Sequence, residues 1–202
     1  MVAVSIKSKL QPMNSGIKLL IEKPLSEAEL LAVTGEAEQR MVAAFASESR
    51  RREALMWRCI VRRELGADAE ICYNELGAPQ VTNREVCIGV SHSADFVAVI
   101  IAPVRCAVDI ERLDRNFERV SSRYITPEER MLSCDERLPA ILWCAKEALY
   151  KFSGEKGIDF LRDLRILEVD AENGFAVGQI RDGHPIKMNV KFHSDNVVVY
   201  IA

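Results

Sequence analysis

The order of apolar and polar positions along the chain predicts a mixed helix and strand protein. Ser26 and Glu29 have the spacing of a capping box, so a helix begins in the segment SEAE. A second helix is expected in EAEQRMVAAF, after a short break. A third, longer helix is expected in SRRREALMWRCIVRREL, with Ser47 or Ser49 as its cap and Gly66 at its end.

Strand patterns surround these helices. Residues 1–25 are predicted to hold strands, and short strands are expected at EICY and VCIGV, with the turn-rich NELGAPQVTN between them. FVAVIIA and CAVDIE are predicted to be a strand pair with a turn near Pro103. Helices are then expected around 116–122, 127–133 and 139–152, and residues 164–202 predict a meander of strands that ends in VVVYIA.

One segment of the chain has an echo about half the chain length later. HSADFVAVIIA begins at His92, and HSDNVVVYIA begins at His193. A duplicated fold with two similar halves would give such an echo. Two turns followed by strands can also look alike by chance, and the pattern alone leaves both interpretations open.

Composition narrows the class of protein. The chain has 202 residues, 49% of them hydrophobic, which suits one large or two small globular domains. With 27 basic and 30 acidic residues the net charge is −3, so no basic excess points to nucleic acid. No apolar run is long enough to span a membrane, and the N-terminus lacks the continuous apolar stretch of a secretion signal. The six cysteines show no C-x-x-C spacing, and reduced thiols in a cytoplasmic protein are expected.

The segment AVDIE carries the first candidate chemistry. In a strand, Asp109 and Glu111 point to one face and Ile110 to the other. Two neighbouring carboxylates repel each other unless a cation lies between them, and such hard oxygen ligands suit magnesium. A strand with one solvated face would show the same pattern.

The segment LPAILWCAKEALYKFSG predicts a helix between Pro139 and Gly154. One of its faces is apolar. The opposite face carries two aromatic and three charged side chains, Trp143, Lys146, Glu147, Tyr150 and Lys151. A large aromatic residue there indicates that a ligand or another element covers this face as well. A helix buried on two sides, with an ion pair between Glu147 and Lys151, is the structural alternative.

Together these segments resemble the phosphopantetheinyl transferase superfamily. The family has a G-V-D-I-E-like strand, here AVDIE at 107–111, and a W-x-x-K-E-A helix with a further lysine, here WCAKEALYK at 143–151. A serine–histidine turn precedes the first motif, here VSHSADFVAV, and a helix with an early glutamate lies between the motifs, here RYITPEERML. The likeness spans Ser91 to Lys151 and extends more loosely to about Arg50.

In length the chain resembles members of the longer, surfactin-synthetase type, since the shorter members are about half this size and assemble from several chains. Glu111 in the D-I-E triplet also fits the longer type. The resemblance implies an α+β fold of two similar halves, related by a pseudo-two-fold axis and forming one compact unit. We expect residues 1–103 to contact coenzyme A and residues 104–202 to hold the metal site and the W-x-x-K-E-A helix. The fused chain would act as a monomer.

The resemblance implies a magnesium-dependent enzyme of the holo-[acyl-carrier-protein] synthase kind. Such an enzyme moves 4′-phosphopantetheine from coenzyme A to a serine of an apo acyl or peptidyl carrier protein, leaving adenosine 3′,5′-bisphosphate, with no nucleic acid or membrane as partner. Alternatives are a non-catalytic relative that binds coenzyme A or carrier protein, another magnesium phosphotransferase or phosphodiesterase, and a structural interaction domain. No Walker-type loop or Rossmann fingerprint favours a nucleotide enzyme of those kinds.

The resemblance also implies roles for single residues. The metal on the pyrophosphate would be held by Asp109, Glu111 and Glu147. Glu147 is also the candidate base, directly or through a metal-bound water. The remaining contacts to coenzyme A would come from Lys151 on the same phosphates, from His92 on the 3′-phosphate, and from Ser91, Lys146 and Arg50 or Arg51.

Glu129 matches the glutamate of the intermediate helix, which implies a catalytic role. The residue also completes a capping box with Thr126, and both roles stay open. Two positions depart from the family pattern. Ala78 stands where the family often has the lysine of Gly-Lys-Pro, and Gly89 stands where it often has asparagine.

The segment RLDRNFERVSSR follows the acidic pair and is locally basic. Its arginines could dock an acidic carrier protein, with Leu113 and Phe117 as apolar anchors. A solvated helix face is the alternative. The arginines are Arg112, Arg115, Arg119 and Arg123.

Overall fold

Residues 16–202, which the computed structural model describes, form an α+β fold, as the sequence predicts. The first elements are β1 (Lys18–Glu22), α1 (Glu27–Val33), α2 (Glu36–Ala43), α3 (Glu48–Leu65), β2 (Ile71–Tyr73), β3 (Pro79–Val81), β4 (Cys87–His92) and β5 (Val97–Ala102). The later elements are β6 (Ala107–Arg112), the 3-10 segments η1 (Glu118–Arg123) and η2 (Glu129–Met131), α4 (Leu138–Ser153), β7 (Leu164–Asp170), β8 (Phe175–Ile180), β9 (Ile186–His193) and β10 (Asn196–Ile201).

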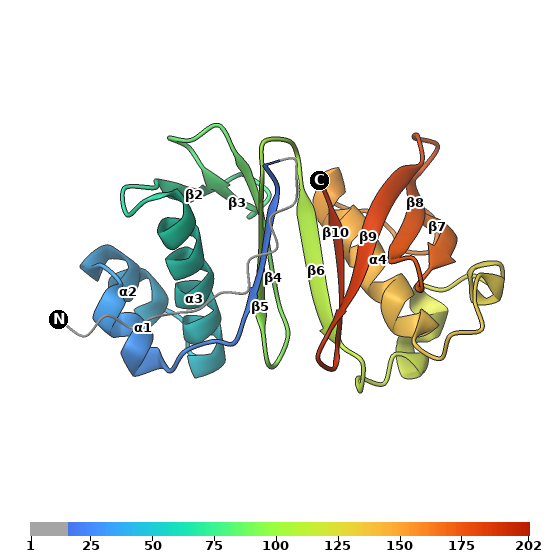
Figure 1. The fold of residues 1–202 in the computed structure, drawn as a ribbon, viewed down its shortest axis with the longest axis horizontal. Coiled ribbons are helices and arrows are strands. Elements are labelled where there is room, and N and C mark those ends of the chain that lie inside the picture. Colours follow the sequence, from blue (N-terminus) through green and yellow to red (C-terminus); the bar gives the residue numbers. More distant parts are fainter. Residues whose placement is uncertain (1–15) are drawn as a thin grey trace.

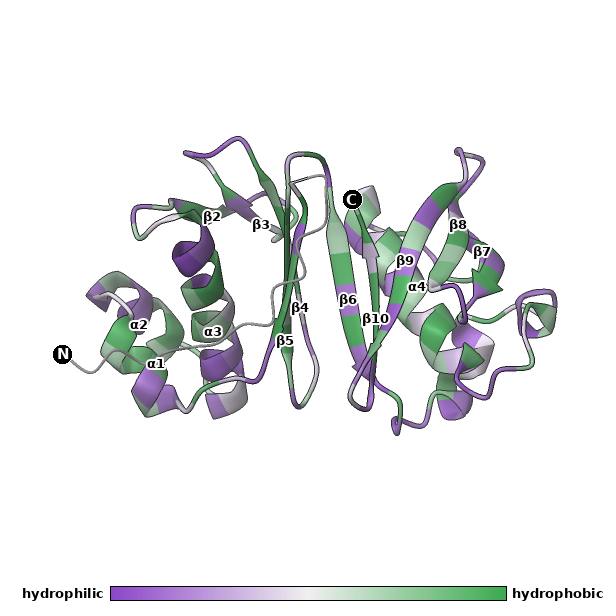
Figure 2. Ribbon diagram, in the orientation of Figure 1, coloured by the Kyte–Doolittle hydropathy of each residue, from purple (hydrophilic) through white to green (hydrophobic). Residues whose placement is uncertain are grey.

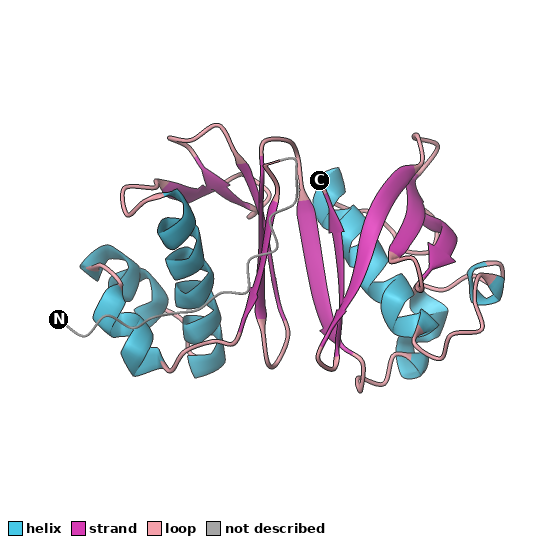
Figure 3. Ribbon diagram, viewed as in Figure 1, coloured by secondary structure: helices cyan, strands magenta, loops and turns pink. Residues whose placement is uncertain are grey.

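Two antiparallel sheets stand side by side in the middle of the molecule (Figure 1). The three-stranded sheet has the order β1-β5-β4, and the five-stranded sheet has the order β6-β10-β9-β8-β7. The helices α1 to α3 lie on one flank and α4 on the other (Figure 3). The short strands β2 and β3 form a separate hairpin beside α3.

The central strand β5 is apolar, and both of its faces are covered (Figure 2). All six residues of β5 are buried. Their alternate side chains belong to two different cores, one under α3 and one between the two sheets. The core between the sheets, which we call the seam, consists of Phe96, Ala98, Ile100, Ala102, Cys106, Val108, Ile110, Val198 and Tyr200.

The ends of the helices follow the predicted signals. Ser26 and Glu29 form the capping box of α1. Ser47 caps α3, and α4 extends one residue beyond the expected range at each end. Gly154 ends α4 with a φ of 60°, in the left-handed region that favours glycine.

Several predicted elements need correction. The segments FVAVIIA and CAVDIE are not a hydrogen-bonded pair, because β5 pairs with β1 and β4 while β6 pairs with β10. The turn at Pro103 therefore passes from one sheet to the other. The helices expected at 116–122 and 127–133 are short 3-10 segments, and the turn-rich stretch before β4 contains the strand β3. The predicted N-terminal strands include β1, but their residues 1–15 lie outside the described part of the chain.

The meander predicted from residue 164 onward is confirmed as β7 to β10. The echo in the sequence also has a structural counterpart. His92 ends β4 and His193 ends β9, and each precedes a tight turn into the next strand. The orders β1-β5-β4 and β6-β10-β9 correspond strand by strand. The ring of Phe96 in the first turn lies 4.7 Å from the ring of His193 in the second.

Two further features concern the chain as a whole. All six cysteines are free thiols. Among the described residues, no helix has the length and apolar character needed to cross a membrane.

Candidate active site

The strand β6 and the helix α4 pack against each other and bring the predicted acidic residues to one place. The alternation expected for AVDIE is present: Ile110 is buried in the seam, while Asp109 and Glu111 contact side chains of α4. The negative charges of both carboxylates raise the pKa of Glu147, so its side chain lies near them. The three side chains thus come from facing positions on two elements.

Asp109 is the most buried of the three, with 4% of its surface exposed. Its Oδ1 accepts hydrogen bonds from Ser91 Oγ at 2.8 Å and from Lys151 Nζ at 2.7 Å. Lys151 also donates to Ser91 Oγ at 2.9 Å and to the Val108 carbonyl at 3.1 Å. Three segments that lie far apart in the sequence, β4, β6 and α4, therefore meet at one carboxylate oxygen.

Glu111 is held from the other end of the site. Its Oε1 accepts hydrogen bonds from Trp143 Nε1 and from Arg115 Nη1, both at 2.8 Å. Burial, together with the negative charge of Asp109, raises the pKa of Glu111, and Arg115 opposes this. Trp143 is itself packed against the rings of Tyr124 and Phe160. The second covered face of α4, expected from this tryptophan, is thus covered by protein at Trp143.

Glu147, like Glu111, is half-buried. Burial is the main cause that raises its pKa to about 7, and the charges of Asp109 and Glu111 add to it. Lys151 and Arg115 act in the opposite direction. No hydrogen bond engages its carboxylate within residues 16–202. A carboxylate whose pKa lies near neutrality can accept a proton at physiological pH.

The chemistry of these side chains suits a divalent cation. Three carboxylates supply hard oxygen atoms, and the buried Oδ2 of Asp109 has no hydrogen-bond partner among the described residues. A cation would also relieve the repulsion that raises the pKa values of Glu111 and Glu147. As the side chains stand, however, no group of three or more His, Cys, Asp or Glu within residues 16–202 is arranged so that it could hold a metal ion.

Lys146 and Glu129 are brought together away from these carboxylates. Lys146 Nζ lies 2.8 Å from Glu129 and donates to the Phe160 carbonyl at 2.9 Å. Glu129 also accepts from the backbone N–H groups of Thr126 and Ile166, at 2.9 and 2.8 Å. The two side chains are 0% and 3% exposed. Their contacts are those of a buried ion pair and a capping box, so they favour the structural alternative for Glu129.

His92 and the arginines of α3 lie on the other side of β4. His92 Nε2 is 3.3 Å from Glu53 Oε2 on α3. Arg51 forms an ion pair with Glu27 and donates to the Phe45 carbonyl, so its guanidinium is engaged by protein. Arg50 is exposed and has no ion pair or side-chain hydrogen bond within the described chain. Of the two arginines, Arg50 is the one free to meet a ligand.

A cavity of about 300 Å³ adjoins the carboxylate group. It lies between the loop before β3, the strands β4 and β6, and the end of α4. Its wall includes Ala78, Gly89, Val108, Tyr150, Lys151 and Lys156. Both positions that depart from the family pattern therefore line the same cavity.

Close packing around position 89 explains why a glycine occupies it. A Cβ at this position would lie 2.8 Å from Ile100 Cγ2 and 3.2 Å from the Ala107 Cα. A side chain at this position would require Ile100 to move and the backbone of β6 to shift slightly. The asparagine of the family pattern would not fit without these shifts.

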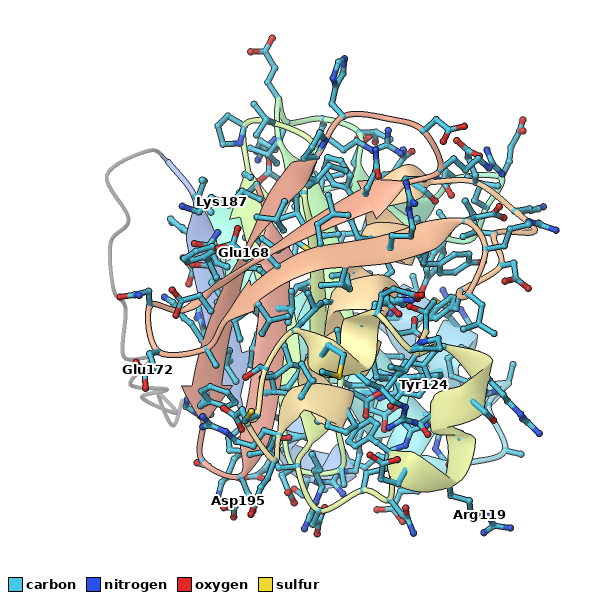
Figure 4. All side chains as sticks on the ribbon, turned by 90° about the vertical axis from the view of Figure 1, so that its right-hand side faces the viewer. Arg119, Tyr124, Glu168, Glu172, Lys187 and Asp195 are labelled. Carbon is cyan, nitrogen blue, oxygen red and sulfur yellow. The ribbon has the colours of Figure 1, made fainter. Side chains whose placement is uncertain are left out.

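The basic segment after β6 is only partly available to a partner. Arg112 pairs with Asp95 and Asp114, and Arg115 pairs with Glu111. Phe117 is buried, so it is not the exposed anchor that the sequence suggested. Arg119 and Arg123 are exposed, and Arg119 extends away from the molecule in Figure 4, while Tyr124 lies between the 3-10 segments and α4.

Two functional candidates were not identified from the sequence. Arg115 was considered only as a docking residue, because Glu111 lies on a strand and only the turn after β6 brings Arg115 back to it. Glu53 belongs to no recognisable sequence motif, and only the fold places it beside His92.

Residues 105–202 match the model of a family described as the 4′-phosphopantetheinyl transferase superfamily. The matched range contains the whole five-stranded sheet and α4. No curated protein matches the chain.

Proposed function

Since the chain belongs, through residues 105–202, to the 4′-phosphopantetheinyl transferase superfamily, we propose that it transfers the 4′-phosphopantetheine group of coenzyme A to a serine of an apo carrier protein. The observation that carries this proposal is the meeting of Asp109, Glu111 and Glu147 beside Lys151 and an adjoining cavity. The second product would be adenosine 3′,5′-bisphosphate.

We propose that Asp109, Glu111 and Glu147 would hold magnesium. When bound there, the metal would neutralise charge on the transferred phosphoryl group. Lys151 contributes a fixed positive charge from α4, and its bonds to Ser91 and Asp109 aim it at the same place. Trp143 and Arg115 orient Glu111.

The carrier serine must lose a proton as its oxygen attacks the β-phosphorus of coenzyme A. Glu147 is the proposed acceptor, directly or through a water molecule, because its pKa is raised to about 7 and its carboxylate is free of hydrogen bonds to the described residues. Glu129 and Lys146 are proposed as positioning residues, since their buried ion pair connects the start of η2 to α4, the helix that carries Trp143.

Coenzyme A is proposed to lie along the edge of β4. Its pyrophosphate would lie at Lys151, and the cavity would take a neighbouring part of the molecule. His92 and the exposed Arg50, which precedes Glu53 by three residues on α3, are proposed to contact the 3′-phosphate. Lys156 in the cavity wall offers a positive charge across from Ala78, where the family pattern has its lysine.

The two halves 1–103 and 104–202 are proposed to be related as in the longer, surfactin-synthetase type. The corresponding strand orders and the seam between the sheets support this relationship and a monomeric enzyme. The carrier protein is proposed to be acidic and to dock beside η1, where Arg119 and Arg123 are exposed. The free thiols agree with the proposed cytoplasmic location.

Intact-mass spectrometry of an apo acyl carrier protein tests the proposal. With the protein, coenzyme A and magnesium, the carrier should gain the mass of one phosphopantetheine group, and EDTA should abolish the gain. Asp109→Ala should lower the transfer rate at least 100-fold, on the scale of losing a charged contact in the transition state. Glu172→Gln removes a carboxylate from the turn between β7 and β8, well apart from Tyr124 in Figure 4, and should leave the rate unchanged.

A folded protein that binds coenzyme A but modifies none of several carrier proteins would contradict the proposal. That result would favour the alternative of a non-catalytic relative.

A further inference from the structure

His92 and Glu53 form an ion pair between two elements that are distant in the sequence. His92 ends β4, and Glu53 lies in the second turn of α3. The side chain of Glu53 is 17% exposed, whereas that of His92 is 55% exposed. The pair therefore has a sheltered carboxylate behind an imidazole that faces solvent.

Both oxygens of Glu53 are engaged. Oε2 lies 3.3 Å from His92 Nε2, and Oε1 accepts a hydrogen bond from Ser49 Oγ at 2.7 Å. Ser49 is four residues earlier on α3, so the helix itself fixes the carboxylate. A carboxylate fixed in this way fixes the direction of the ring that it holds.

The contact also determines what the other ring nitrogen offers. With Nε2 turned to the Glu53 carboxylate, a neutral ring that keeps its proton on Nε2 presents a lone pair at Nδ1, which repels an anion. The protonated ring presents an N–H at Nδ1, which can donate to an anion. Among the described residues Glu53 is the one acidic group within ion-pair distance of His92.

We propose that Glu53 is a positioning residue that holds His92 with its Nδ1–H directed at the 3′-phosphate of coenzyme A. The inference rests on the proposed function, because it takes the nucleotide as the ligand. The exposed guanidinium of Arg50, in the first turn of the same helix, adds a second cation to this anion site. The carboxylate of Glu53 stays on the far side of the ring from the phosphate.

A comparison of two nucleotide ligands isolates the contribution of the 3′-phosphate to binding. Calorimetric titration should be performed with coenzyme A and with dephospho-coenzyme A, which lacks this phosphate. Glu53→Gln should weaken binding of coenzyme A on the order of tenfold, the scale of one hydrogen bond to a charged group. Binding of dephospho-coenzyme A should not change.

Two further variants distinguish positioning from a loss of fold. Glu48→Gln is the matched control, because it removes the same charge from the same helix without touching His92. In a His92→Ala background, Glu53→Gln should have no further effect on the preference.

Three results would overturn the inference. Glu53→Gln could bind coenzyme A as tightly as wild type or more tightly, which would mean that the carboxylate restrains His92 rather than presents it. The variant could weaken both nucleotides equally, which would indicate a structural role. Wild-type protein could bind both nucleotides equally well, in which case His92 meets no 3′-phosphate. Transfer itself is judged separately by the mass assay, so each proposal can fail alone.

Discussion

At the scale of single residues, the site is built from groups whose charges are not balanced in pairs. Asp109 has Lys151 and Glu111 has Arg115, but Glu147 lies among them with its carboxylate unpaired within residues 16–202. Proteins usually avoid such an arrangement for stability alone. The unpaired carboxylate therefore supports the proposal that a ligand binds here.

Glu147 should make stability depend on pH. Its pKa is about 7 in the folded protein against an ordinary 4.5, so between these values the folded state binds more protons than the unfolded state. Stability should therefore be highest below about pH 4.5 as far as this group is concerned, and should fall as pH rises through 7. Thermal unfolding in EDTA across this window should show the decline for wild type and a smaller one for Glu147→Gln. An equal decline in both would contradict the prediction.

Lys146 should be essential for folding stability. Lys146→Met leaves the buried carboxylate of Glu129 without its cation and should cost about 3–5 kcal/mol, as for other broken buried pairs. The double variant Lys146→Met with Glu129→Gln should recover part of this loss. Urea denaturation measures both. A single variant as stable as wild type would show that the pair contributes nothing.

The sequence predicted residue identities better than residue contacts. The alternation of AVDIE placed Asp109 and Glu111 on one face, because the period of a strand is rigid. The contacts of Glu53 and Ser91 depend on how β4 lies against α3 and β6. No local pattern carries that information.

At the scale of elements, helix limits were predicted well because capping is local chemistry. Ser26, Ser47 and Gly154 act within one turn of the chain. Pairing of strands was predicted less well. The segments of β5 and β6 are adjacent in the sequence, yet their partners come from β1, β4 and β10. β5 is a continuous apolar run because it is covered on two sides, and such a run does not reveal its partners.

Gly89 offers a prediction about the contact between β4 and β6. Gly89→Asn restores the family pattern but places a side chain against Ile100 and the backbone of β6. Overpacking of this kind should cost about 1–3 kcal/mol and should weaken, not improve, binding of coenzyme A in the adjoining cavity. Thermal unfolding and titration with coenzyme A measure the two effects.

Gly35→Ala is the control for Gly89→Asn, since a Cβ at Gly35 meets nothing within 4 Å. It should change stability by less than about 1 kcal/mol. Tighter binding of coenzyme A by Gly89→Asn would show that the glycine is a defect of the site rather than a packing requirement.

At the scale of the whole molecule, the two sheets share the seam. Side chains of β5 and β6 and of β10 are buried in it, with Ile100, Val108, Ile110 and Val198 all fully covered. The site also depends on the seam, because Ser91 and Asp109 lie on strands from the two sides. Neither sheet can bury its central face alone.

The two parts should therefore unfold together. The chain has one tryptophan in each, Trp57 on α3 and Trp143 on α4, so Trp57→Phe and Trp143→Phe leave one reporter apiece. Fluorescence of each variant in urea should follow circular dichroism with one common midpoint. Separate midpoints for the two spectroscopic signals within a variant would show that the seam does not couple the sheets.

Ile100→Ala tests the seam directly. The side chain is fully buried between the sheets, so the deletion should lower the free energy of unfolding by about 2–5 kcal/mol. The transition should remain single. Loss of stability confined to one part would contradict a shared core.

The family match begins at residue 105, just where the chain leaves the first sheet for the second. A fragment cut at that point would keep all three carboxylates and expose the apolar face of β6 and β10 to water. An exposed apolar face drives association, so the fragment would bind its own copies or precipitate. The first part of the chain therefore covers this face and keeps the part that carries the acidic residues from aggregating.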